Sequence, residues 1–155
     1  MLKITINDTE LQAAFKRLKQ AATDQRAAFQ DISEYTLRRV DSTFRDEKDW
    51  YGLPWQPLSA KTLKQKRKQR PPAIQKILQN TGLFRSSFSY DAGTDFAEIG
   101  SNRVGKNGAP LGLLHQLGSR RLPKRETLPN EQRGLPRQDT EEILAILEEH
   151  ITGAW

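Results

Sequence analysis

The strongest constraint on the fold is the segment of residues 49–63, DWYGLPWQPLSAKTL, in which one glycine and two prolines are interleaved with large aromatic residues. The glycine and the prolines cannot continue a helix, so a helix that enters this segment must end there. The aromatic side chains carry large apolar faces that are stabilised by burial. We therefore interpret Trp50 and Trp55 as a small core, although aromatic residues in a basic protein can also be stacking platforms for nucleic-acid bases.

Two helical patterns precede this segment. Apolar residues at spacings of three and four within residues 11–18 predict a helix that is capped by Asp8 or Thr9. A second pattern covers residues 23–44, and a helix of this length would measure about 33 Å at a rise of 1.5 Å per residue. Upstream of both, residues 2–6 alternate between apolar and polar side chains, which predicts a half-buried first strand.

Basic residues are concentrated in the middle of the chain, because no carboxylate occurs between Asp49 and Asp91. Ser59 can cap a short helix there, but this helix has almost no apolar side chains, so we expect it to be exposed, or disordered while the protein is alone. Pro71 and Pro72 end it. We predict a basic interaction arm that consists of Lys61, Lys64, Lys66, Arg67, Lys68 and Arg70, together with Arg120 and Arg121 in a later loop.

Two kinds of partner fit such an arm. Clustered lysines and arginines can neutralise the phosphates of DNA whatever its base sequence. They can equally meet an acidic surface on a protein. The C-terminal segment is itself acidic, because it has five Asp and Glu residues and no Lys or Arg after Arg137. The composition leaves both partners open.

The segment after the basic arm combines a helical and a strand pattern. Ile74, Ile77 and Leu78 predict a helical face, and Gly82 stands where a helix needs a residue with positive φ to end. From residue 83 the period changes to two, and residues 83–90 predict a strand. The residues expected on one face of that strand are Phe84, Ser86, Phe88 and Tyr90. A turn sequence, DAGTD, then leads into FAEIGS, and together they predict an antiparallel hairpin.

Loops dominate the chain from residue 101 to the last helix. Residues 101–112 predict a long loop or an insertion at a hairpin tip, and residues 120–137 predict either a late strand with loops or an arm that orders on contact. We expect flexible segments at residues 61–72, 101–112 and 120–137. Asp139 or Thr140 caps the predicted last helix. Its expected buried stripe consists of Ile143, Leu144, Ile146, Leu147 and Ile151.

No residues in the sequence have the spacing of a catalytic or metal centre. His115 lacks a partner that could orient its ring, since Gln116 is a poor candidate, and we expect a packed histidine. Neither His115 nor His150 stands at a spacing that places two metal ligands on one face. The absence of cysteine excludes disulfides and thiolate chemistry. We predict no enzyme activity, no cofactor, no metal and no membrane segment, because no apolar run approaches the length of a membrane span.

Several motifs follow one another in an order that is typical of one phage family. They are a tryptophan-proline-leucine loop before a basic helix, an Ile-Leu-x-x-Thr-Gly-x-Leu-x-x-Ser motif at the start of the sheet, and a His-Gln-x-Gly motif after an Ile-Gly strand. The residues that carry this pattern are Trp50, Trp55, Pro57, Leu58, Thr81, Gly82, His115, Gln116 and Gly118. The chain resembles the virion morphogenesis, or tail-completion, proteins of Mu-like and related temperate tailed phages.

The resemblance implies a structural protein that completes the head-proximal end of the tail, so that the tail can join a filled head. The implied partners are the phage tail tube and head-connector proteins. The implied location is the host bacterial cytoplasm during assembly and the tail or neck of the virion afterwards. Because the basic segment and the acidic last helix have opposite charges, we also expect a head-to-tail homo-oligomeric ring, a hexamer because a tail tube is six-fold. The alternative function is that of a small basic protein that binds DNA non-specifically.

These elements together predict one α+β domain over residues 1–155. We expect N-terminal helices, one of them long, packed on a small and mostly antiparallel sheet, with a further helix at the C-terminus.

Overall fold

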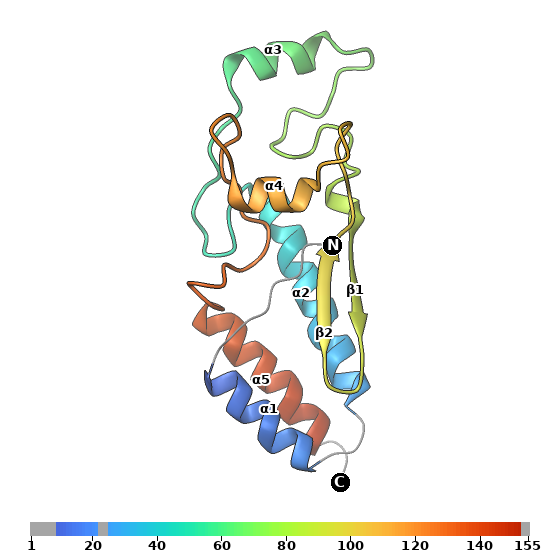
Figure 1. Cartoon of the computed structure of the whole chain (residues 1–155), viewed down its shortest axis with the longest axis vertical. Coiled ribbons are helices and arrows are strands. Elements are labelled where there is room, and N and C mark those ends of the chain that lie inside the picture. The colour runs from blue at the N-terminus through green and yellow to red at the C-terminus, as the bar shows by residue number, and fades with distance from the viewer. Residues whose placement is uncertain (1–8, 22–24, 153–155) are drawn as a thin grey trace. The chain divides into compact units, whose positions relative to one another are not determined.

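The computed structural model describes residues 9–21 and 25–152. Within them the fold is α+β, as predicted, with five α-helices, one short 3₁₀ helix (η1) and a two-stranded sheet. The elements in chain order are α1 (Thr9–Ala21), α2 (Arg26–Asp46), α3 (Ala60–Lys68), η1 (Arg85–Ser87), β1 (Phe88–Ala92), β2 (Ala97–Ser101), α4 (Leu111–Leu117) and α5 (Arg137–Thr152) (Figure 1). The predicted strand at residues 2–6 and the predicted cap at Asp8 lie outside the described residues.

The chain divides into two compact units. The first unit consists of residues 38–89 and 100–128, and the described part of the second consists of residues 9–21, 25–37, 90–99 and 129–152. Helix α2 and the sheet contribute residues to both units, because the boundaries fall within these elements.

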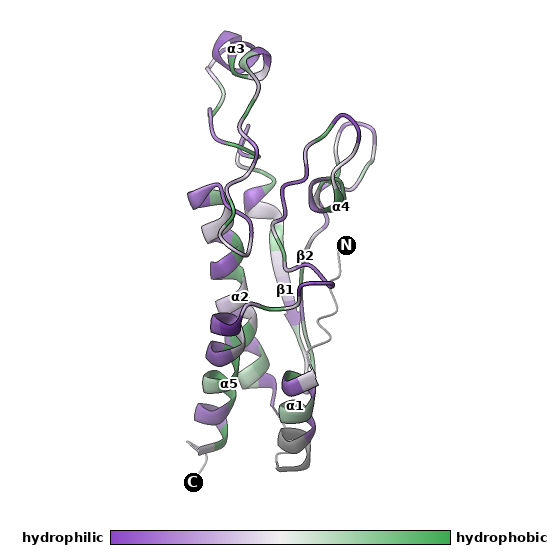
Figure 2. Ribbon diagram, turned by 90° about the vertical axis from the view of Figure 1, so that its left-hand side faces the viewer, coloured by the Kyte–Doolittle hydropathy of each residue, from purple (hydrophilic) through white to green (hydrophobic). Residues whose placement is uncertain are grey.

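The second unit has a hydrophobic core formed by α1, the first part of α2, and α5. Apolar residues at helical spacing give these helices one apolar face, and Figure 2 shows the resulting alternation of green and purple along α2 and α5. The rings of Phe15 and Phe29 stack with their centroids 5.5 Å apart. Each large apolar side chain buried here contributes about 1.5–3 kcal/mol. The fully buried members are Leu11, Ala28, Phe29, Ile32, Ile143 and Leu147, so the helical stripes predicted from the sequence are confirmed.

Helix α5 begins at Arg137, two residues before the first predicted capping residue. The prediction that Asp139 or Thr140 caps it is therefore wrong, because both residues lie inside its first turn. Asp139 is buried there and accepts a hydrogen bond of 2.5 Å from the Tyr35 hydroxyl of α2. This contact joins α5 to α2 within the second unit.

Helix α2 ends where the proline-rich segment begins. Glu47 adopts a positive φ of 53°, which ends the helical path. The amide of Lys48 still donates to the Thr43 carbonyl at 3.1 Å, and the amide of Trp55 donates to the Glu47 carbonyl at 2.8 Å. The loop after α2 is thus folded back on the end of the helix.

The aromatic residues of the first unit form a small core around Phe44, which is fully buried. The Phe44 ring packs edge-on against Trp55, Phe84 and Phe88 at centroid distances of 5.6, 5.6 and 5.8 Å. Trp50 and Trp55 are 2% and 4% exposed. The interpretation of the two tryptophans as a small core, and not as stacking platforms, is confirmed.

The helix predicted around Ile74, Ile77 and Leu78 is wrong, because these residues form bends and a turn. Side chains of Lys66 and Glu47 form hydrogen bonds with backbone groups that would otherwise pair with one another in a helix. Lys66 donates to the carbonyls of Ile74 and Lys76, and Glu47 accepts from the amide of Ile77 at 2.6 Å.

The strand predicted from residue 83 begins only at Phe88. Residues 85–87 form η1, in which the Ser87 hydroxyl donates to the Phe84 carbonyl at 2.7 Å. Arg85 anchors this turn on α2, because its guanidinium makes two hydrogen bonds to the Asp41 carboxylate at 2.6 and 2.7 Å. Residues four apart lie on one side both in a strand and in a helical turn. The positions of Phe84 and Phe88 in the sequence therefore cannot distinguish a strand from a single helical turn here.

The predicted hairpin of residues 88–101 is confirmed, and the amide of Gly93 closes its turn by donating to the Phe96 carbonyl at 2.9 Å (Figure 1). Residues 103–111 form a second tight turn, with a bridge between Val104 and Pro110. Residues 120–136 contain no strand, so the late strand that was one alternative for residues 120–137 does not form.

Candidate interaction surfaces

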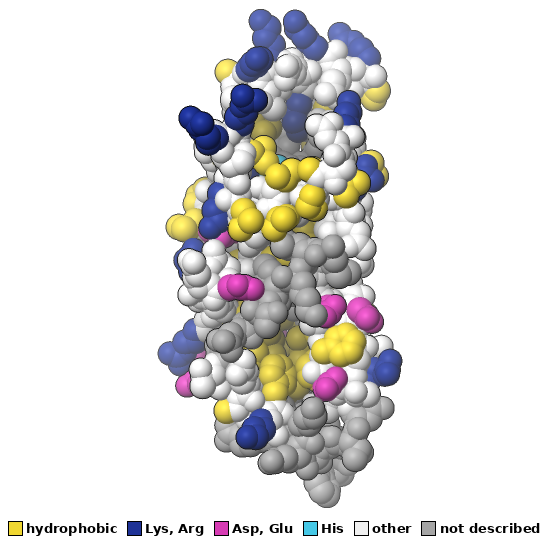
Figure 3. All heavy atoms as spheres, viewed as in Figure 1, with side chains coloured by type: hydrophobic (Ala, Val, Ile, Leu, Met, Phe, Trp, Pro, Cys, Tyr) yellow, Lys and Arg dark blue, Asp and Glu magenta, His cyan; other side chains and the backbone are white. Residues whose placement is uncertain are grey.

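Helix α3 presents most of the predicted basic arm on the surface of the first unit. Ser59 caps the helix, as predicted, and accepts a hydrogen bond of 3.1 Å from the Thr62 amide. Figure 3 shows the Lys and Arg side chains gathered over α3 and the adjoining loops. The exposed members of the predicted arm in this segment are Lys61, Lys64, Arg67, Lys68 and Arg70.

Lys66 differs from these residues because it is buried, with 7% of its surface exposed. Its ammonium donates hydrogen bonds of 2.6 Å to the Ile74 carbonyl and 3.0 Å to the Lys76 carbonyl. Burial lowers the pKa of Lys66, and the nearby Glu47 carboxylate opposes that shift. Lys66 therefore holds the turn that follows α3.

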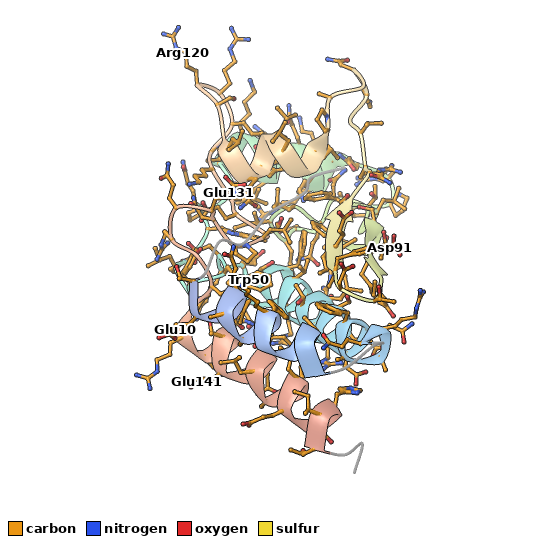
Figure 4. All side chains as sticks on the ribbon, turned by 60° about the horizontal axis from the view of Figure 1, so that its bottom comes forward. Glu10, Trp50, Asp91, Arg120, Glu131 and Glu141 are labelled. Atoms are coloured by element: carbon orange, nitrogen blue, oxygen red, sulfur yellow. The ribbon has the colours of Figure 1, made fainter. Side chains whose placement is uncertain are left out.

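Arg120 and Arg121 are exposed on the loop after α4, and Figure 4 shows the Arg120 side chain extending away from the ribbon. Ser119 shapes this loop, because its hydroxyl accepts hydrogen bonds from the amides of Arg121 and Leu122 at 3.4 and 3.2 Å. Both arginines are thus exposed on the surface of the first unit, and their role in an interaction arm stays a prediction.

The His-Gln-x-Gly motif joins α4 to the buried segment of residues 125–129. The Gln116 side chain is 6% exposed, and its amide group donates to the Leu128 carbonyl at 2.8 Å. Its oxygen accepts from the amides of Thr127 and Leu128 at 3.1 and 3.2 Å. Gly118 has a φ of 71°, and a Cβ at this position would lie 2.9 Å from the Lys124 amide nitrogen. The glutamine and the glycine of the motif are therefore structural.

The tryptophan-proline-leucine loop is attached to the same buried segment. The Trp55 indole nitrogen donates to the Glu126 carbonyl at 3.0 Å. Arg125 is 6% exposed and donates to the Gln56 carbonyl through Nε and Nη2, at 3.1 and 2.8 Å, and to the Pro57 carbonyl at 3.4 Å. Two motifs that lie about 60 residues apart in the sequence thus meet at residues 125–128.

The Thr-Gly pair shapes the turn before η1. Gly82 has the positive φ that the sequence predicts, at 76°, and its carbonyl accepts from the Ser86 amide at 3.0 Å. The Thr81 hydroxyl accepts from the Leu83 amide at 3.4 Å. The pair therefore directs the chain from the turn after α3 into the aromatic core.

His115 packs against Phe84 with the ring centroids 5.7 Å apart, which confirms a packed histidine. Burial and the neighbouring Arg125 lower the pKa of His115 to about 4, so the ring is neutral at neutral pH. Its Nδ1 atom is buried without a hydrogen-bond partner. The second histidine, His150, lies in the other unit, where its Nε2 is 2.6 Å from Asp31.

A pocket of about 550 Å³ opens in the first unit between α3, the turn at residues 78–84, the turn at residues 103–106, and α4. Its lining includes four cationic side chains and no carboxylate. The cations are Lys66, Arg103, Lys106 and Arg125, and the apolar lining includes Leu58, Leu78, Leu83, Phe84, Val104 and Leu111. No local sequence pattern predicts this pocket or the burial of Lys66 and Arg125, because these features depend on contacts between segments far apart in the chain.

The charges of the protein are segregated between the two units. The first unit has 18 Lys and Arg residues against 5 Asp and Glu, a net charge of +13, and the described part of the second has 6 against 12, a net charge of −6. In the second unit, acidic residues lie on the outer faces of α1 and α5, as Glu10 and Glu141 show in Figure 4.

The described residues hold no group of three or more His, Cys, Asp or Glu side chains that could bind a metal ion. Across the same residues no helix is both long and apolar enough to cross a membrane.

The comparisons with known proteins identify a family but no individual relative. No curated protein and no solved structure matches the chain significantly. The chain matches the model of the phage virion morphogenesis family over residues 6–152, nearly its whole length. The motif residues that suggested such a family from the sequence are the ones that tie the first unit together. The chain therefore belongs to the phage virion morphogenesis family, whose members have a structural role in assembly of the phage particle.

Proposed function

We propose that this protein completes the head-proximal end of the phage tail and supports its joining to the head, and that it does so as a homo-oligomeric ring. The observation that carries the proposal is the charge segregation, with a net charge of +13 on one unit and −6 on the described part of the other. In a family of virion assembly proteins, such a distribution favours contacts between copies.

Opposite charges on two different surfaces favour a head-to-tail contact between copies. In such a contact the basic unit of one copy meets the acidic unit of the next, and a chain of these contacts closes into a ring when the rotation between copies fits. Electrostatic complementarity also speeds the encounter between copies and prevents contact between surfaces of like charge. A tail tube is six-fold, so we propose a hexamer that contacts the tail tube on one side and head-connector proteins on the other.

We propose that the protein catalyses no reaction and needs no cofactor. Gln116 and Gly118 belong to the same His-Gln-x-Gly motif as His115. Gln116 binds the backbone of residues 127–128, and Gly118 allows the close approach of Lys124. His115 itself packs against Phe84, and its depressed pKa follows from burial and a positive neighbour. A general base needs a group that orients it and a pKa near the working pH.

A second candidate function is non-specific binding of DNA, which the exposed cations of α3 favour. Electrophoretic mobility shifts over a salt series separate the two candidates. Tight binding that weakens steeply with salt supports the DNA-binding function, and weak binding together with ring formation supports assembly.

The decisive experiment removes the gene from the phage and follows assembly by electron microscopy. We expect filled heads and separate tails to accumulate, and we expect purified protein added to the lysate to restore joined, infectious particles. Normal yields of infectious particles without the gene would overturn the proposal.

A further inference from the structure

The turn of the β1–β2 hairpin is an acidic surface with an exposed aromatic side chain. Phe96 is 42% exposed, and Asp91 and Asp95 lie near it in the sequence, both exposed. No lysine or arginine occurs between Arg85 and Arg103. Figure 3 shows hydrophobic and acidic side chains together where the hairpin turns.

The hairpin holds this aromatic ring in a fixed place. The Phe96 ring lies directly over Gly93, where any Cβ atom would overlap it, and the Gly93 amide donates to the Phe96 carbonyl. A ring that is positioned before contact loses less conformational entropy on binding than a mobile one. An exposed and positioned aromatic side chain is a common anchor of protein interfaces.

The pocket of the first unit has the complementary character. Arg103 and Lys106 stand in one wall, and two large apolar side chains of its lining, Leu83 and Val104, are 48% and 51% exposed. Its volume of about 550 Å³ lies within the range of sites that bind small organic groups or side chains. An apolar, positively charged and carboxylate-free pocket fits an aromatic side chain flanked by carboxylates.

We propose that the hairpin turn of one copy inserts Phe96 into the pocket of the next copy, where Asp91 and Asp95 face Arg103 and Lys106. This inference rests on the ring proposed above and names the surfaces that would form it. It commits to a second copy of the chain as the occupant, because both surfaces belong to this chain and carry opposite charges. DNA is disfavoured in the pocket, because phosphates gain nothing from its apolar lining, whereas the exposed cations of α3 suit them better.

The absence of cysteine from the chain gives a direct test. One preparation carries Thr94→Cys, at an exposed position in the same turn that leaves Phe96 in place, and a second carries Val104→Cys. The two are mixed at a concentration where rings form and are then oxidised. A disulfide needs Cα atoms within about 7 Å, so a covalent dimer of the two different variants reports the proposed contact. The matched control replaces Val104→Cys by Leu53→Cys, which is exposed in the same unit but outside the pocket lining.

The expected result is a heterodimer with Val104→Cys, and a yield lower by about tenfold or more with Leu53→Cys. Equal yields would overturn the proposal. A chain that carries both cysteines and forms a disulfide only within itself would overturn it as well. Labelling of Val104→Cys with a thiol reagent tests DNA as the occupant. If a DNA duplex slows the labelling and wild-type protein, which has Phe96, does not, the proposal is overturned and DNA binds in the pocket.

Charge exchange provides a second readout that does not depend on cysteine geometry. Asp91→Arg and Arg103→Glu should each weaken ring formation by about tenfold, and the two substitutions in one chain should restore it. The control pairs Asp91→Arg with Lys64→Glu, a cation of α3 outside the pocket lining, and should give no rescue.

The outcomes separate this inference from the proposed function. If rings form but neither the cross-link nor the charge rescue is observed, the hairpin contact is overturned and the proposal of a ring still stands. Protein that stays monomeric under all conditions would overturn the ring and, with it, the hairpin contact.

Discussion

The Lys66 ammonium donates a hydrogen bond of 2.6 Å to the carbonyl oxygen of Ile74, eight residues further along the chain. A second bond reaches the Lys76 carbonyl, so one buried cation organises the whole turn after α3. The most basic segment of the protein therefore contains residues of two kinds, one structural lysine and several exposed cations.

Replacement of Lys66 by alanine should destabilise the protein by about 1–3 kcal/mol, because two part-buried hydrogen bonds to the carbonyls of the following turn are lost. Lys64→Ala, on the exposed face of the same helix, is the matched control and should change stability by less than about 0.5 kcal/mol. Urea unfolding of the two variants measures the difference. Equal free energies of unfolding for the two variants would show that the hydrogen bonds of Lys66 do not stabilise the fold.

Gln116→Ala should cost about 2–4 kcal/mol, since the amides of Thr127 and Leu128 and the Leu128 carbonyl would all lose a buried partner. The exposed Gln75 provides the control, and Gln75→Ala should leave the unfolding midpoint close to that of the wild type. If Gln116→Ala were equally harmless, the structural role of the His-Gln motif would be excluded.

The His115 side chain should make stability depend on pH. The pKa of His115 is about 4 in the folded protein and about 6.5 in the unfolded chain. Between these values the unfolded state binds a proton that the folded state does not, so stability is full above about pH 6.5 and falls as the pH drops towards 4. Because the ring keeps some exposure to solvent, we expect a loss on the order of 1–2 kcal/mol.

Urea unfolding at pH 7.5 and pH 4.5, in the wild type and in His115→Gln, isolates this contribution. The variant should lose less stability over this pH interval than the wild type, since carboxylates titrate in both proteins and only the histidine differs. An identical pH dependence would place the folded pKa of His115 near its ordinary value.

Reversal of three exposed charges on α3, with Lys64→Glu, Arg67→Glu and Lys68→Glu together, should weaken self-association at low salt by about tenfold or more. The fold should be retained, because all three side chains are exposed. Lys16→Glu, in the acidic unit, is the control and should leave association unchanged, as sedimentation velocity can measure. Stronger association of the triple variant would contradict the charge-based contact.

The sequence was sufficient to predict the elements whose patterns are local. Apolar spacing predicted α1, α2 and α5, and the turn chemistry around Gly93 predicted the hairpin. Trp50 and Trp55 were recognised as a small core because large aromatic residues fixed near helix-breaking residues have few other places to pack.

The wrongly predicted helix around Ile77 has a physical cause that is not local, because side chains distant in sequence bind its backbone groups. The helix predicted at Ile74 and Leu78 does not form because Lys66 and Glu47 bond to that backbone. The Glu47 carboxylate accepts a hydrogen bond from the Ile77 amide, 30 residues further along the chain. No local sequence pattern predicts such a pair. For the same reason the pocket and the buried Arg125 escaped prediction.

The measurement that tests the central claim most directly is the mass of the purified protein at high concentration, by sedimentation velocity, at about 50 mM and about 500 mM salt. The account predicts one closed oligomer, a hexamer, at low salt and its dissociation at high salt, since screening weakens contacts between oppositely charged surfaces. A monomer at every concentration and salt, or open polymers of unlimited length, would contradict it.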